Sequence, residues 1–110
     1  MKPAFKYAVI SALYQAEEEG LWEYEIYSLL KDKYEKAALC SLREDLVGFS
    51  TIGWLSVIAI REYQGTMLRK FRLQQRHKPF IEYHLSPEQV LASLGINDDP
   101  RVLVAMGRGE

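Results

Sequence analysis

The hydrophobic period of the sequence changes near residue 54, and this change limits the fold more than any other feature. Before it, apolar residues recur at three- and four-residue spacing, the pattern of one face of a helix. Three such stripes predict helices over about 4–19, 22–34 and 37–50. Because the connections between them are short, these helices are predicted to pack on one another.

The second half of the chain carries strand and turn signals. The run from Leu55 to Tyr63 is rich in Val and Ile. In the run that follows, Met67, Phe71 and Leu73 alternate with Leu68, Lys70 and Arg72. Between them, Gln64-Gly65-Thr66 predicts a hairpin turn. The run from Phe80 to Leu85 also alternates, which predicts a third strand. The predicted fold is therefore α+β, with three N-terminal helices followed by a small antiparallel sheet.

Length and composition indicate one domain. The chain has 110 residues, of which 48% are hydrophobic, enough for a single core. Ser86-Pro87-Glu88-Gln89 predicts a capping box at the start of a short C-terminal helix that ends at Gly95. We therefore place the domain at residues 1–95 and expect a partly flexible C-terminal tail at 96–110, where apolar residues are few near the end.

The sequence offers little for catalysis or membrane insertion. No apolar run approaches the roughly 20 residues that cross a bilayer, and the N-terminus lacks a secretory signal, so the expected location is cytoplasmic. The single cysteine, Cys40, excludes an intramolecular disulfide and a multi-cysteine zinc site. His77 and His84 have no further ligands at metal-binding spacing, and no phosphate loop or nucleophile elbow occurs. We predict no enzyme, no catalytic residue, no metal and no cofactor.

The order helix, helix, helix, strand, turn, strand is that of a winged helix-turn-helix, in which the hairpin forms the wing. The run from Trp22 to Lys31 resembles the second helix of the PadR-like transcriptional regulators, and Gly53-Trp54-Leu55 is similar to their entry into the first wing strand. The run from Phe80 to Ser86 resembles the end of their wing. The resemblance implies a transcriptional regulator, and a small-molecule effector of unknown identity would fit it.

Positive charge is concentrated in one segment. The net charge is −1, and residues 1–60 carry six Lys or Arg against nine Asp or Glu, whereas residues 61–78 carry six against one. A basic stripe on an acidic domain is one way to bind a polyanion. The alternative is the solvent face of a hairpin, charged to prevent edge-to-edge aggregation. Charge alone does not choose between them.

The winged-helix interpretation assigns two sets of DNA-binding residues. The third helix would enter the major groove, and the wing would contact phosphate or the minor groove. Glu44 and Asp45 bring negative charge to the third helix, so the wing is the stronger candidate. The predicted contacts are Lys36, Ser41 and Arg43 on the third helix, and Arg69, Lys70, Arg72, Arg76 and Lys78 on the wing.

Two hypotheses follow for the function. The first is a DNA-binding transcriptional regulator that binds double-stranded DNA as a homodimer, because paired half-sites are usually read by two-fold dimers. Its dimer contact is expected to come from the first helix and residues 87–106. The second is a winged-helix protein-interaction module that has lost DNA binding, which the acidic third helix favours.

Overall fold

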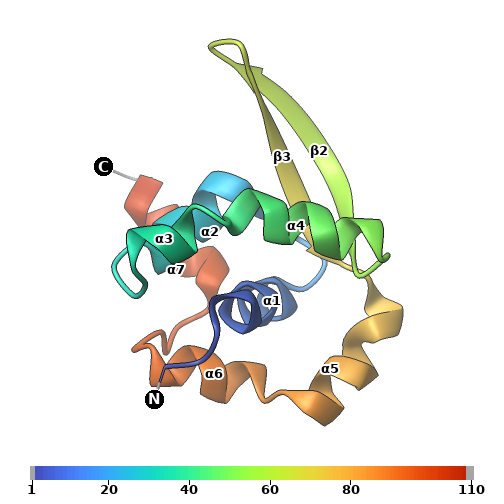
Figure 1. Cartoon of the computed structure of the whole chain (residues 1–110), viewed down its shortest axis with the longest axis vertical. Coiled ribbons are helices and arrows are strands. Elements are labelled where there is room, and N and C mark those ends of the chain that lie inside the picture. Colours follow the sequence, from blue (N-terminus) through green and yellow to red (C-terminus); the bar gives the residue numbers. More distant parts are fainter. Residues whose placement is uncertain (1, 109–110) are drawn as a thin grey trace.

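The computed structural model describes residues 2–108, and its first half is helical (Figure 1). The helices are α1 (Phe5–Ala16), α2 (Glu23–Leu30), α3 (Lys36–Leu39) and α4 (Leu42–Thr51). Helix α4 lies on one side of α1, and α2 lies beside it. The predicted first and second helices are confirmed with shorter bounds.

Helix α1 is the centre of the core. Small and apolar side chains cover most of its surface, and Ala8, Ala12 and Ala16 are completely buried. Small side chains let neighbouring helices approach closely, and α6 (Pro87–Ser93) packs along α1 on the side away from α4. Of the residues Phe5–Ala16, only Lys6 and Tyr7 are exposed.

The prediction of one continuous third helix is wrong, because the helix is interrupted between α3 and α4 at Cys40 and Ser41. The Ser41 hydroxyl donates to the Ala38 carbonyl oxygen at 2.7 Å. A serine that bonds to nearby backbone in this way competes with helical hydrogen bonding. Helix α4 then restarts at the buried Leu42, with the Ser41 carbonyl accepting from the Asp45 amide at 2.9 Å.

A three-stranded antiparallel sheet follows the helices. Its strands are β1 (Leu21–Trp22), β2 (Leu55–Tyr63) and β3 (Thr66–Leu73), in the order β1-β3-β2. Strands β2 and β3 form a long hairpin that rises away from the helices near one end of α4 (Figure 1). Its turn residues, Gln64 and Gly65, both have positive φ, 51° and 81°, as a tight hairpin turn requires. The predictions of an α+β fold and of this hairpin are confirmed.

The predicted third strand at residues 80–85 is wrong, because this segment forms α5 (Lys78–His84) after a 3₁₀ turn at Gln75–His77. Pro79 lies in the first turn of α5, where its fixed φ suits a helix and its missing amide hydrogen is not needed. Ile81 is buried in the core from the helical position. The third strand of the sheet is instead β1, where a loop and the start of a helix were predicted.

The C-terminal part contains two more helices. Helix α6 confirms the predicted short helix, but Ser86 makes no side-chain capping bond, so the predicted capping box does not form. Where we expected a tail, α7 (Pro100–Arg108) packs on α1 and α2. The Asp99 carboxylate supports its first turn by accepting from the Arg101 amide at 2.8 Å and pairing with its guanidinium at 2.6 Å. Residues 109–110 of the predicted tail lie outside the described part.

Candidate nucleic-acid interface

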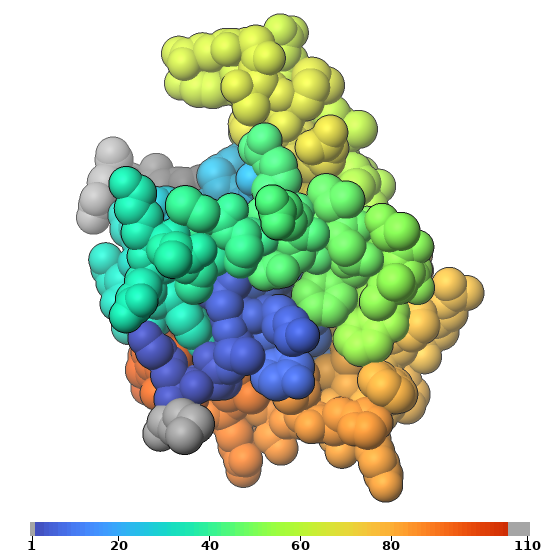
Figure 2. All heavy atoms as spheres, viewed as in Figure 1, coloured from blue at the N-terminus to red at the C-terminus, as the bar shows by residue number. Residues whose placement is uncertain are grey.

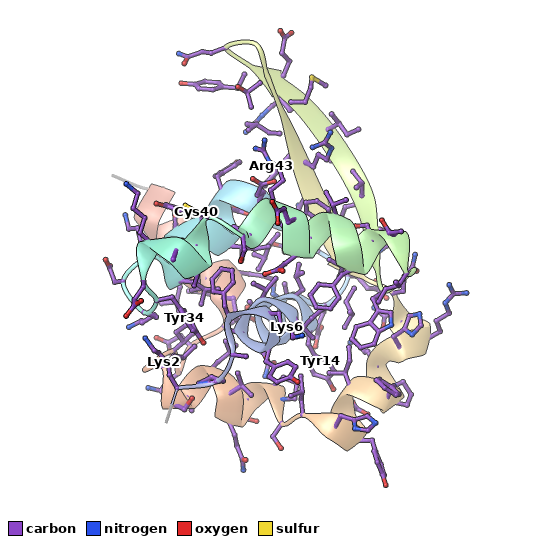
Figure 3. All side chains as sticks on the ribbon, in the orientation of Figure 1. Lys2, Lys6, Tyr14, Tyr34, Cys40 and Arg43 are labelled. Atoms are coloured by element: carbon purple, nitrogen blue, oxygen red, sulfur yellow. The ribbon has the colours of Figure 1, made fainter. Side chains whose placement is uncertain are left out.

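The predicted third-helix contacts fall on both α3 and α4. Lys36 is exposed at the start of α3, and Arg43 is exposed on α4, while Ser41 is half-buried between the two helices. Figure 3 shows Arg43 on the side of α4 from which the hairpin rises. The interruption of the helix therefore separates these residues onto two short elements instead of one recognition helix.

The charge of Arg43 is already used within the protein. Its guanidinium forms a salt bridge with the Glu23 carboxylate of α2, with Nη2 and Oε2 3.1 Å apart and Nε 3.2 Å from the same oxygen. An exposed pair of this kind contributes little to stability, but a phosphate would have to compete with Glu23 for the guanidinium. Glu44 and Asp45 follow on the same helix. Helix α4 is therefore a poor attractor for a polyanion.

The hairpin separates its cations by face. Phe71 and Leu73 point into the core and are buried. Because side chains alternate along a strand, Lys70 and Arg72 lie on the opposite face, whereas Arg69 lies on the face of Phe71. Neither Lys70 nor Arg72 forms an ion pair or side-chain hydrogen bond with another described residue.

Arg61 joins Lys70 and Arg72 on their face, although it was not among the predicted site residues. Strand pairing places Arg61 opposite Leu68, which shares a face with Lys70. The Arg61 guanidinium lies 5.0 Å from the centre of the Trp22 ring and donates to the Tyr24 hydroxyl at 3.1 Å. Over residues 55–73, all of them described, this face carries no carboxylate. We call Arg61, Lys70 and Arg72 the basic face.

Arg76 and Lys78 lie beyond the end of β3 and outside the basic face. Arg76 Nε donates to His77 Nε2 at 3.3 Å. Lys78 Nζ lies 5.1 Å from the centre of the Tyr14 ring on α1. The Tyr14 hydroxyl donates to the Glu82 carboxylate, and this hydrogen bond, with burial and the nearby negative charge, raises the pKa of Tyr14 to about 12. The five predicted wing cations therefore lie in three places. Lys70 and Arg72 are on the basic face, Arg69 is on the opposite face of the hairpin, and Arg76 and Lys78 follow β3.

The other face of the hairpin carries exposed apolar side chains. Met67, Ile60 and Val57 share it with Arg69 and Glu62, and Ile60 is 58% exposed. Val47 is exposed on α4, and in Figure 2 the hairpin stands above the α4 surface. A groove of about 560 Å³ lies between the hairpin, α2 and the α3–α4 region. We call Val57, Ile60 and Met67 the apolar face.

The described residues contain neither a metal-ligand cluster nor a membrane-spanning helix. Among them, no group of three His, Cys, Asp or Glu side chains is placed to hold a metal ion. None of their helices combines the length and apolar character needed to cross a bilayer. A comparison of the chain with protein-family models, curated proteins and solved structures finds no match. The function is therefore inferred from the geometry.

Proposed function

We propose that this chain is a winged helix-turn-helix protein that binds double-stranded DNA as a homodimer and regulates transcription. The order α1, β1, α2, α3 with α4, β2 and β3, together with the sheet order β1-β3-β2, supports the winged-helix assignment. The observation that carries the proposal is the basic face, where three cations share one side of the hairpin without a carboxylate.

The two elements have different roles in this proposal. The basic face contacts phosphates, which provides affinity that is independent of sequence and sensitive to salt. Lys36, Ser41 and Arg43 approach the major groove, where arginine and serine side chains can contact base edges. Because the Arg43 guanidinium is paired with the Glu23 carboxylate, contacts to base edges add less to the affinity than contacts to phosphates do.

Duplex binding measured by fluorescence anisotropy over a range of salt concentrations tests the proposal. When a variant removes one phosphate contact, the dependence of log K on log salt becomes shallower by about 0.9. We expect this change for Lys70→Gln. Lys31→Gln, which removes the same charge from the exposed end of α2, is the matched control and leaves the slope unchanged. A wild-type chain without salt-dependent duplex binding contradicts the proposal.

The apolar face favours a second candidate, a protein-interaction module. Exposed apolar side chains that lie together commonly mark interaction surfaces, and here Val57, Ile60 and Met67 are exposed on the face of the hairpin opposite the basic face. Ile60→Lys separates the candidates. Because Ile60 lies on the face opposite the basic face, a lysine there should leave duplex binding by the basic face nearly unchanged, and it should disrupt binding of an apolar protein partner.

A further inference from the structure

Arg61 is the exposed cation of the basic face, and aromatic side chains hold it in place. Lys70 and Arg72 on the same face are half-buried. The Arg61 guanidinium lies 5.0 Å from the centre of the Trp22 ring, and its Nη2 donates to the Tyr24 hydroxyl at 3.1 Å. A guanidinium carries several N–H donors. Arg61 can therefore keep these contacts and still donate to a ligand.

The aromatic rings that hold Arg61 are themselves fixed by the fold. Trp22 of β1 pairs with Lys70 of β3, which places the Trp22 side chain on the basic face. The buried Glu25 carboxylate accepts from the Trp22 amide at 2.9 Å, where β1 meets α2. The Tyr24 ring on α2 stacks with the Trp22 ring, and their centres are 6.0 Å apart. The contacts of Arg61 are therefore made to an ordered surface.

The partners of Arg61 leave its charge available, unlike the partner of Arg43. The guanidinium of Arg43 is paired with the Glu23 carboxylate, which offsets its positive charge. An indole ring attracts a cation through the negative face of its π-system, and a tyrosine hydroxyl accepts a hydrogen bond, yet neither group carries a net charge. Arg61 thus combines a fixed position with an uncompensated charge.

We infer that Trp22 and Tyr24 are positioning residues that orient Arg61 as a preformed phosphate contact of the basic face. The inference rests on the DNA binding of the proposed function and names the residues that set its geometry. A side chain that is ordered before binding loses less conformational freedom when the ligand binds. The planar guanidinium adds to this advantage, because its donors keep a fixed arrangement towards phosphate oxygens.

Duplex titrations of the full chain by fluorescence anisotropy, over a range of salt concentrations, test the inference. Arg61→Gln removes one cation, so the dependence of log K on log salt should become shallower by about 0.9. Tyr24→Phe keeps every cation and removes only the hydroxyl. We expect it to weaken binding by about threefold, the effect of losing one hydrogen bond, while the salt slope stays that of the wild type.

Tyr27→Phe is the matched control for Tyr24→Phe. Tyr27 lies on the same helix, is 47% exposed, and forms no side-chain hydrogen bond with another described residue. Removing its hydroxyl should leave duplex binding unchanged.

A double-mutant cycle separates positioning from a general structural role of Tyr24. Because Tyr24 acts through Arg61, Tyr24→Phe should have no further effect on duplex binding in an Arg61→Gln background. A purely structural role would weaken binding equally in both backgrounds, and that result overturns the inference.

NMR relaxation of the arginine Nε–H groups measures the positioning without DNA. In the free protein, the order parameter of the Arg61 Nε–H group should fall in Tyr24→Phe, because the guanidinium loses one of its contacts. It should keep the wild-type value in Tyr27→Phe.

An Arg61 order parameter that does not change in Tyr24→Phe overturns the inference, as does a Tyr24→Phe chain that binds duplex as tightly as the wild type. If the wild type still binds duplex with a steep salt dependence, the DNA-binding part of the function stands. A wild-type chain without salt-dependent duplex binding contradicts the proposed function, and the inference fails with it.

Discussion

Helix α4 and the β2–β3 hairpin both carry cations, but the two elements differ in whether carboxylates lie beside those cations. The exposed cation of α4, Arg43, is paired with Glu23, and Glu44 and Asp45 lie beside it. On the hairpin, Lys70 and Arg72 face away from the core on a surface without carboxylates. A count of cations therefore does not locate a polyanion site, because neighbouring carboxylates and the direction of each side chain decide how much charge is available.

The largest expected effect comes from Gly20, which directly precedes β1 and lies against the backbone of β3. Gly20 has φ +72°, and a Cβ at this position would lie 2.3 Å from the Phe71 carbonyl oxygen. Gly20→Ala therefore forces the β1–β3 pairing apart. We expect the free energy of unfolding, measured by urea denaturation, to fall by at least about 2 kcal/mol. Duplex binding should also weaken, because the hairpin is displaced from the helices.

Gly48→Ala is the matched control for this substitution. Gly48 lies within α4, and no atom lies within 4 Å of a Cβ built there. Alanine in a helix interior is favoured over glycine by about 0.5–1 kcal/mol, so the variant should be slightly more stable than the wild type. Equal stabilities of the two alanine variants would contradict the account of how the hairpin is held.

A smaller effect is expected when Arg43 is released from its partner. In Glu23→Gln the guanidinium becomes available to phosphate, and an exposed ion pair is worth at most about 1 kcal/mol. Duplex binding at low salt should therefore tighten by up to about fivefold, in an anisotropy titration. Glu88→Gln removes the same charge from α6 and serves as the control. Unchanged binding in both variants would mean that α4 does not approach the DNA backbone.

Lys78 should behave differently from Lys70 although both were predicted to contact DNA. Its Nζ lies over the Tyr14 ring, away from the basic face. We expect Lys78→Gln to leave the salt slope nearly unchanged, while Lys70→Gln lowers it by about 0.9. The same titration series measures both slopes, and equal reductions would place the DNA across the base of the hairpin.

The smallest effect concerns the contact beneath Lys78 and appears only at alkaline pH. The pKa of Tyr14 is raised to about 12 from 10.0, mainly by its hydrogen bond to Glu82. The protonated hydroxyl is favoured in the folded state, so its contribution is complete below pH 10 and disappears as the pH rises towards 12. Tyr14→Phe should flatten this alkaline loss of stability in thermal unfolding. An unchanged pH profile would contradict the assigned hydrogen bond.

Local signals explain what the sequence could predict. The Gln64-Gly65 turn and its flanking strands follow from residues that are neighbours in sequence, and the structure has them at the predicted place. The alternation of residues 80–85 predicts a strand, but Ile81 and Leu85, which both pack on the core, lie four residues apart and so also satisfy helical spacing. Strand β1 has two residues, too few to show any period.

Which cations form the candidate site depends on strand register and on contacts between helices, and sequence spacing shows neither. The segment 61–78 was recognisable as basic, but one step along β3 moves Arg69 to the face opposite Lys70. Arg61 became part of the basic face only through its register with β3. The pairing of Arg43 with Glu23 joins two helices, and no spacing rule within either helix indicates it.

In the proposed function, the hairpin supplies more of the charge that binds DNA than α4 does. The most direct test compares two double variants that each remove two positive charges, Lys70→Gln with Arg72→Gln and Lys36→Gln with Arg43→Gln. We predict that the hairpin variant lowers the slope of log K against log salt by nearly two units, since each phosphate contact contributes about 0.9, and that the α3–α4 variant lowers it by less than one such contact. Equal reductions, or a larger one for the α3–α4 variant, would contradict the claim.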